Sequence, residues 1–301
     1  MGAWVSDLAL ILVTLIWGVT FSITKEGVVY MDPLLYLAFR FGMAYLLLRP
    51  VSYLLERRKY TWEETKIGAG AAFFFFTGFV TQTAALQYTT ASKAAFITGL
   101  SVVLVPILSI IILKEKPHRM AVIGAFVAFL GLAALSVEPG MPTWIGFGDL
   151  LALACAFSFA GHILFIGHYA NSIKPIPFST IQIGFVALLS AVIGVFKGPI
   201  PDFTALPATI WWGLAYLAVL ATMTTTLLQT WAQQQTSSTR TAVIFTLEPV
   251  FAAIFAFLML GEAITLRTII GGSFIIAGIL LAELGPQMKE APQAEPAVPE
   301  S

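Results

Sequence analysis

The stretch Gln82-Thr83-Ala84-Ala85-Leu86-Gln87 decides the fold, because it returns 147 residues later as Gln229-Thr230-Trp231-Ala232-Gln233-Gln234. From position 82 to 135, about 15 of 54 positions are identical in this register. The register also pairs charged and glycine positions, namely Lys93 with Arg240, Glu115 with Glu262, Gly124 with Gly271 and Gly131 with Gly278. Upstream the offset becomes 142 and pairs Asp7 with Asp149. A duplication of this extent predicts two copies of one structural unit.

The composition indicates that both copies lie in a membrane. Charged residues make up 11% of the chain and hydrophobic residues 58%, whereas soluble domains carry roughly 25% charged residues. Each apolar stretch is long enough to cross roughly 30 Å of hydrocarbon as a helix, and none shows the period-two alternation of a membrane barrel. We therefore predict an all-α polytopic protein with ten transmembrane helices, at residues 8–24, 33–48, 67–86, 91–113, 120–137, 147–167, 178–196, 210–229, 241–260 and 268–284.

The basic residues predict the orientation of these helices. When the loops are assigned alternately to the two sides, one side holds eleven Lys and Arg residues: Arg49, Arg57, Arg58, Lys59, Lys66, Lys114, Lys116, Arg119, Lys174, Arg240 and Lys289. The other side holds four, Lys25, Lys93, Lys197 and Arg267, and only Arg40 lies within a span. The positive-inside rule therefore places both termini in the cytoplasm.

The odd number of helices in each copy determines how the copies are related. Five helices leave the chain on the opposite side of the membrane, so the second copy must be inverted with respect to the first. The expected units are a first five-helix repeat at 1–140, a second, inverted repeat at 141–285, and a disordered Pro/Glu/Ala-rich cytoplasmic tail at 286–301. The first span has no basic residue before it, and we interpret it as a retained helix rather than a secretory signal.

Several motifs resemble one transporter family. The run from Glu248-Pro249 to Gly261-Glu262 is similar to the signature of the EamA family of the drug/metabolite transporter superfamily, and Trp17-Gly18, Arg40-Phe41 and the 94–100 stretch leading to Pro106 resemble the same family. The resemblance implies ten helices in two inverted repeats, a central cavity, and movement of amino acids or other small metabolites, often outward. One departure is that the first copy has Ser101-Val102 where the second has Glu248-Pro249. The helix breaks expected near Pro106 and Pro249 therefore need not be equivalent.

Ionisable residues within spans are the first candidates for the transport path, because a polar side chain facing lipid is costly. Glu248 is the only carboxylate near the middle of a span, and it either binds a proton or a substrate amine, or is a protonated or paired group that stabilises the break at Pro249. His162 either hydrogen-bonds between helices or lines the cavity. Arg40 is expected to have a structural or gating role, in which its side chain either snorkels to the interface or forms an ion pair. The alternative is that it contacts the substrate.

The duplicated glutamines are the second group of candidates. Gln82 and Gln229 either join helices through hydrogen bonds or line a hydrated passage. The second reading is supported by further polar residues that continue the same stripe, namely Thr222, Thr225, Thr226, Gln233, Gln234 and Gln235. Trp17 and Phe96 either close the cavity or pack in the ordinary way. The predicted substrate-binding set is Trp17, Gln82, Phe96, His162, Gln229 and Glu248.

No catalytic or nucleotide-binding motif is present in the sequence, so we expect no enzymatic activity, no cofactor and no metal. The expected function is secondary transport of small organic metabolites, most plausibly amino acids, across the cell membrane. The expected partners are the substrate and the lipid bilayer, with no nucleic acid and with a monomer as a plausible state. A lipid-modifying membrane enzyme, a channel and a receptor are the alternatives.

Overall fold

The computed structural model describes residues 3–89, 91–114, 116–136, 145–197, 203–260 and 264–284, and every regular element in these ranges is a helix. The tail at 286–301 and the loop around Pro142 lie outside the described residues. The elements are α1 (Ala3–Trp17), α2 (Thr20–Tyr30), α3 (Pro33–Glu56), α4 (Trp62–Ala85), α5 (Ala91–Gly99), α6 (Ser101–Leu108), η1 (Ser109–Leu113), α7 (Arg119–Ser136), α8 (Phe147–His168), η2 (Ala170–Ser172), α9 (Pro175–Lys197), η3 (Phe203–Ala205), α10 (Ala208–Ala218), η4 (Val219–Thr224), α11 (Thr225–Gln233), α12 (Ser238–Phe245), α13 (Glu248–Leu260) and α14 (Leu266–Leu284).

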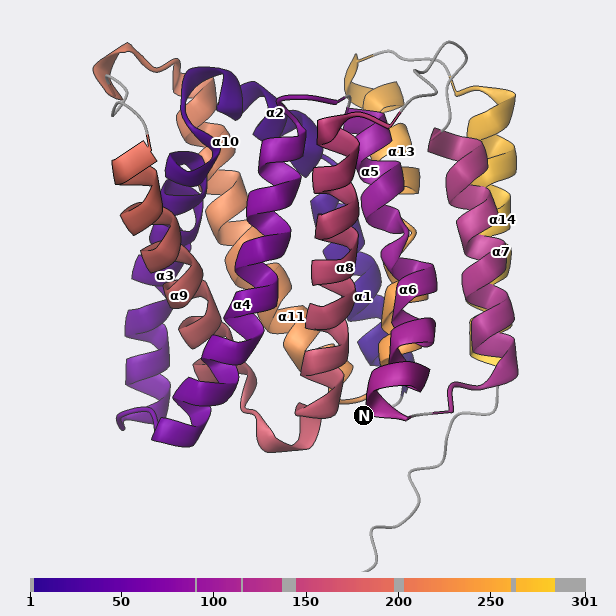
Figure 1. Cartoon of the computed structure of the whole chain (residues 1–301), viewed down its shortest axis with the longest axis horizontal. Coiled ribbons are helices and arrows are strands. Elements are labelled where there is room, and N and C mark those ends of the chain that lie inside the picture. Colours follow the sequence, from indigo (N-terminus) through magenta and orange to yellow (C-terminus); the bar gives the residue numbers. More distant parts are fainter. Residues whose placement is uncertain are drawn as a thin grey trace, which may run out of the picture.

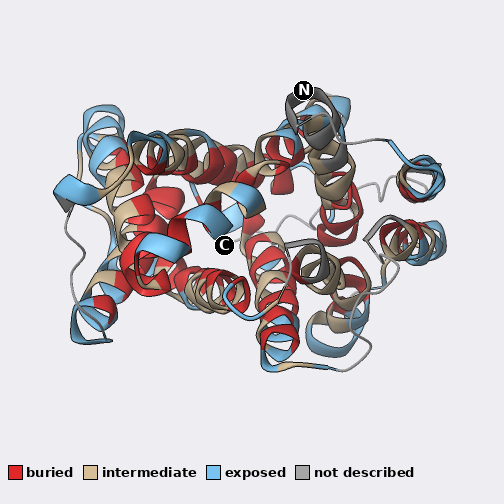
Figure 2. Cartoon of the chain, turned by 90° about the horizontal axis from the view of Figure 1, so that it is seen from above, coloured by how far each residue is buried: buried red, intermediate tan, exposed pale blue. Residues whose placement is uncertain are grey.

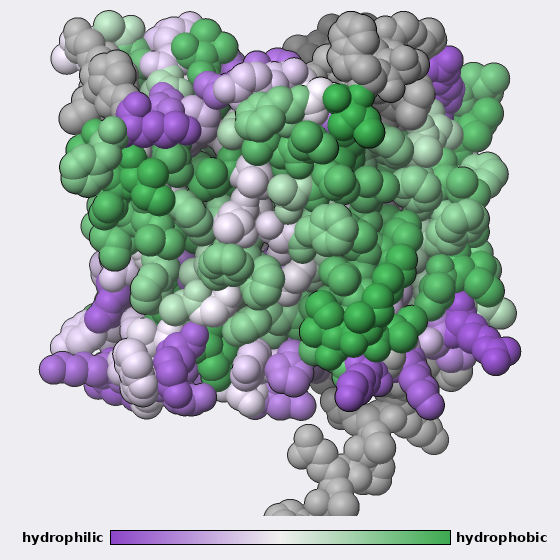
Figure 3. Space-filling view, in the orientation of Figure 1, coloured by the Kyte–Doolittle hydropathy of each residue, from purple (hydrophilic) through white to green (hydrophobic). Residues whose placement is uncertain are grey.

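The helices stand side by side, as in a membrane-spanning bundle (Figure 1). In the described part of the chain, seven helical segments are long and apolar enough to cross a membrane, and two shorter apolar helices run over Arg119–Ala134 and Leu266–Ala282. The space-filling view shows a hydrophobic band between hydrophilic ends (Figure 3). These observations confirm the prediction of an all-helical membrane protein.

The two ends of the bundle collect different loops. The N-terminus and the loops after α3, η1 and α8 lie at the lower end of Figure 1, and the loops after α2 and α4 lie at the upper end. The lower end therefore carries the loops with Arg57, Arg58, Lys59 and Lys174, which the sequence assigns to the side of the membrane with more basic residues.

Local signals explain where two of the long helices start. Asp32 caps α3, because its side chain accepts a hydrogen bond from the Leu34 amide at 2.8 Å, and Pro33 follows at a position where a missing N–H costs nothing. Thr61 and Glu64 form a capping box at the start of α4, and Glu64 also accepts hydrogen bonds from Arg58 at 2.6 and 2.8 Å.

Two glycine contacts set the packing of α7 against α14. A Cβ atom added to Gly124 would lie 2.4 Å from the Gly278 carbonyl oxygen, and one added to Gly131 would lie 2.6 Å from that of Gly271. Because the contact partner moves back along the chain from 278 to 271 as the position advances from 124 to 131, the two helices are antiparallel. Only glycine permits this close approach of backbones.

The helix breaks occupy equivalent positions in the two copies, although the prolines Pro106 and Pro249 do not. The fourth predicted span is interrupted at Leu100, between α5 and α6, and the ninth at Thr246 and Leu247, between α12 and α13. The register of 147 places Leu100 on Leu247. Pro106 lies within α6, and the duplicated register, not this proline, predicts where the first copy breaks.

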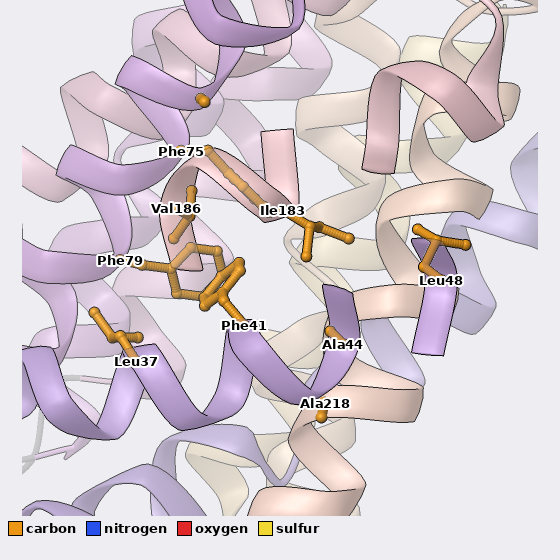
Figure 4. Close-up of a cluster of buried hydrophobic side chains, with 10 residues drawn as sticks. Leu37, Phe41, Ala44, Leu48, Phe75, Phe79, Ile183, Val186 and Ala218 are labelled. Atoms are coloured by element: carbon orange, nitrogen blue, oxygen red, sulfur yellow. The ribbon is translucent and has the colours of Figure 1, made fainter. Parts of the chain in front are cut away.

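The largest apolar cluster of the described residues joins α3, α4, α9 and the end of α10. Its buried members are Leu37, Phe41, Ala44, Leu48, Ala72, Phe75, Phe79, Ile183, Val186 and Ala218. Phe41 contacts both Phe75 and Phe79 edge-on, with centroids 5.6 and 5.0 Å away, and the close-up shows these rings gathered beside Val186 (Figure 4). Seen from above, buried residues face the inside of the bundle and exposed residues its periphery (Figure 2). This cluster forms one side of the polar site described next.

Candidate functional site

A π-helical segment interrupts the helix formed by α10 and α11. Residues Val219–Thr224 form this segment, η4, whereas the duplicated stretch of the first copy lies within the regular helix α4. A π-helical turn removes carbonyl groups from the normal i to i+4 pattern, and such turns are frequent at functional sites. Within this segment, the carbonyl of Ala221 accepts hydrogen bonds from two side chains that belong to other helices.

The first of these side chains is Arg40 on α3, which is buried with 3% of its surface exposed. Its Nε donates to the Thr222 hydroxyl at 2.8 Å and its Nη2 to the Ala221 carbonyl at 3.2 Å. The guanidinium also lies 4.6 Å from the centroid of the Phe79 ring. Arg40 therefore points into the bundle, and the snorkelling expected from the sequence is wrong.

The second side chain is Trp17 at the end of α1. Its Nε1 lies 3.2 Å from the same Ala221 carbonyl and 3.3 Å from the Thr225 hydroxyl. Its ring meets Phe245 edge-on with centroids 5.0 Å apart. The adjacent Gly18 allows this arrangement, because a Cβ atom there would lie 3.2 Å from the Ala252 backbone nitrogen of α13.

Glu248 starts α13 at the helix break and is partly exposed. Its carboxyl group interacts electrostatically with Arg40 of α3 and with Cys155 of α8. Among the described residues it forms no hydrogen bond or ion pair, and Arg40 forms none with a carboxylate. Cys155 itself is fully buried and accepts a hydrogen bond from the Thr98 hydroxyl of α5 at 3.7 Å. Glu248 of α13 is therefore within electrostatic reach of Arg40 on α3 and Cys155 on α8, and Cys155 is hydrogen-bonded to Thr98 of α5.

His162 lies on the other side of the phenylalanine cluster. The ring of His162 stacks on Phe75 with centroids 4.5 Å apart, and Phe75 in turn contacts Phe79. Its Nε2 is 2.8 Å from the Gln182 Oε1 on α9, and both residues are buried. The Nε2 of Gln182 has no hydrogen-bond partner among the described residues. The observed contacts of His162 are those of a histidine that joins neighbouring helices.

Gln229 belongs to a network of hydrogen-bonded polar side chains at the lower end of the bundle. Its Nε2 donates to the Gln233 Oε1 at 3.0 Å, and the Nε2 of Gln233 donates to the Ile163 carbonyl of α8 at 2.9 Å. Gln234 donates to the carbonyls of Ala170 and Ile173. In this conformation the polar residues at 229–234 therefore bind protein groups rather than facing an open passage.

The remaining predicted residues lie in different surroundings. Gln82 is partly exposed on α4, and its side chain forms no hydrogen bond within the described part of the chain. Phe96 stacks on Phe129 at 6.1 Å and packs against the cluster around Leu10 and Leu132. Pro249 is the second residue of α13, where its missing N–H breaks no helical bond. The structure therefore brings Trp17, Arg40 and Glu248 toward one site and leaves Phe96 in ordinary packing.

Sequence reasoning missed several members of this site. Thr98, Cys155 and Phe79 carry no charge, and nothing in an apolar run marks which face of a helix meets Arg40. The cluster of hydroxyl residues at 222–226 was the available signal for η4, because polar residues within a span need an internal partner. Among the described residues no group of three or more His, Cys, Asp or Glu could hold a metal ion.

Comparison with known proteins agrees with this architecture. The model of the EamA-like transporter family matches twice, at residues 4–137 and 146–284, which confirms the resemblance seen in the motifs. An uncharacterized transporter of Archaeoglobus fulgidus is 34% identical over 93% of this chain and 86% of its own length, and the uncharacterized transporter YyaM of Bacillus subtilis is 26% identical over 88% and 89%. One crystal structure, 18% identical, superimposes with a TM-score of 0.76 over 93% of this chain and 96% of that one, which shows a shared fold.

Proposed function

Because the chain belongs to the EamA-like transporter family, we propose that it is a secondary transporter that moves small organic metabolites, in particular amino acids, outward across the cell membrane by alternating access. The observation that carries this proposal is the buried site at η4. Arg40 and Trp17 both donate there to the Ala221 carbonyl of the π-helical segment, and Glu248 starts a second interrupted helix. Interrupted helices near the middle of the bilayer are typical of substrate sites in transporters.

Two inverted repeats, at 1–140 and 141–285, form the scaffold of the proposed mechanism. The glycine contacts between α7 and α14 support this relation. The contact of Gly124 with Gly278 becomes that of Gly271 with Gly131 when each residue is replaced by its duplicate, and the two helices run in opposite directions. A two-fold axis in the membrane plane requires an interface of this kind, in which each contact recurs with the two duplicated residues exchanged.

In the proposed mechanism, we take the lower end of the bundle as the closed end of the described conformation. Asp7 of α1 and Arg240 of α12 form an ion pair there, and both side chains are largely buried. The network of Gln229, Gln233 and Gln234 ties α11 to α8 and to the segment that follows it. We place this end, with both termini, in the cytoplasm, so that the conformation corresponds to the state closed toward the inside.

The proposal is tested with purified protein in liposomes loaded with a mixture of amino acids. We expect counterflow of at least one labelled amino acid without an imposed pH gradient, because a single carboxylate near the middle of the membrane is a sparse relay for protons. Accumulation that requires a pH gradient would overturn the uncoupled mechanism. Sustained conductance would instead indicate a channel, and covalent turnover of lipid an enzyme.

A further inference from the structure

The buried charge of Arg40 is incompletely matched by the protein. A guanidinium has five N–H donors, and the structure uses Nε and one N–H of Nη2 on the neutral oxygens of Thr222 and Ala221. The Nη1 group donates to no described residue. Buried charges are normally paired with an opposite charge, so a site of this kind is suited to an anion.

The nearest matching anion, Glu248, is in a complementary situation. It interacts with the charge of Arg40 without contacting it, and no described residue donates a hydrogen bond to its carboxylate. Glu248 is also partly exposed, although the groups that sense its charge, Arg40 and Cys155, are almost completely buried. Its carboxyl group is therefore close enough to these buried groups for their charges to interact.

The scaffold explains why the two charges stay apart. Arg40 is held at η4 by the Ala221 carbonyl that Trp17 also binds, and Glu248 is held by the break between α12 and α13. Each side chain is thus fixed by a different irregularity of the backbone. A cation and an anion held near each other without contact present the reverse charge pattern of a zwitterion.

We propose that Arg40 and Glu248 together bind the two charges of a zwitterionic α-amino acid, with the substrate carboxylate at the guanidinium and the substrate ammonium at the Glu248 carboxylate. This inference rests on the proposed function and adds to it that both charges are required. Charge-assisted hydrogen bonds to both ends exclude molecules that carry only one of the charges, because each such molecule leaves one buried protein charge unmatched. The aromatic rings of Trp17 and Phe79 lie beside this position and provide an apolar surface for the substituent.

The test compares molecules that differ only in charge. The first set is alanine, ethylamine and propionate, and the second is phenylalanine, phenethylamine and 3-phenylpropionate. Both binding, as the shift in Tm of the detergent-solubilised protein, and counterflow in liposomes are measured. We expect at least one of the two amino acids to raise Tm and to exchange, and its amine and acid analogues to be weaker by about tenfold or more.

Variants then assign each charge to its residue. Glu248→Gln should weaken the amino acid by about tenfold or more while leaving the acid analogue unchanged or improved. Arg40→Lys, which keeps the charge and loses the fork geometry, should weaken the amino acid and the acid analogue but not the amine. Ser273→Ala, on the exposed face of α14, serves as the control.

The outcomes separate this inference from the proposed function. Binding of an amino acid without exchange would retain the zwitterion site and overturn the transport proposal. Exchange of amino acid, amine and acid at similar rates would retain transport and overturn the zwitterion site. Equal losses for all three molecules in both variants, or no Tm shift with any molecule of either set, would also overturn it.

Discussion

At the scale of single residues, the centre of the molecule is organised around one carbonyl oxygen. The Ala221 carbonyl lies in the π-helical segment η4, and Arg40 and Trp17, from two different helices, donate to it. A π-helical turn takes carbonyl groups out of the normal α-helical pattern, and inside a membrane such groups are satisfied by protein or by ordered water. Arg40 and Trp17 therefore stabilise an irregularity that an uninterrupted α-helix would not contain.

Replacing Trp17 by Phe tests this role. The variant keeps an aromatic ring beside Phe245 but removes the donor to Ala221 and Thr225, so the free energy of unfolding should fall by about 1 kcal/mol. Trp212 is 77% exposed, and Trp212→Phe should change stability by less than about 0.5 kcal/mol. Reversible denaturation in detergent measures both variants, and equal effects would show that the indole N–H of Trp17 is not stabilising.

At the scale of elements, α7 and α14 pack by close contact of their backbones. The neighbours of Gly278 are the backbone carbonyl of Gly124 and the backbone nitrogen of Ala128, at 2.6 and 2.7 Å from an added Cβ. Neither can move aside as the end of a side chain could. Gly272 on the same helix has only the Val250 methyl groups nearby, at 3.9 and 4.0 Å.

These two glycines form a matched pair for mutation. Gly278→Ala should destabilise the protein by about 1 to 3 kcal/mol, because the helices must separate to admit the methyl group. Gly272→Ala should be tolerated within about 0.5 kcal/mol, since the space is open. Thermal unfolding in detergent distinguishes the variants. A variant at 278 as stable as one at 272 would mean that the α7 and α14 contact is looser than described.

At the scale of the whole molecule, the duplicated residues of the two copies lie in different environments. Gln229 is 3% exposed and bonded to Gln233, whereas its duplicate Gln82 is partly exposed and unbonded in the described part of the chain. The proposed alternating-access mechanism exchanges these two environments, because the conformations of inverted repeats are interchangeable.

Cysteine labelling of the duplicated positions measures this exchange. In a Cys155→Ala background, Gln82→Cys should react with a membrane-impermeant thiol reagent from the outside in the described conformation, while Gln229→Cys should be protected. Conditions that favour the inward-open state should reverse both reactivities. Unchanged reactivity at both positions under all conditions would contradict an exchange of environments between the repeats.

The sequence by itself determined the helical membrane fold and the family, because hydrophobic length and a duplicated register are local properties of the chain. It placed the break of the fourth span near Pro106, whereas the structure has it at Leu100. It also marked Arg40, Glu248, Trp17 and the threonine run at 222–226, because polar groups in an apolar span are conspicuous. It did not indicate that Arg40 turns inward, that Thr98 donates a hydrogen bond to Cys155, or that Gln229 is hydrogen-bonded while Gln82 is not. Those features depend on which helix faces meet. Only the tertiary structure decides them, because the same helices can satisfy the same polar groups in more than one arrangement.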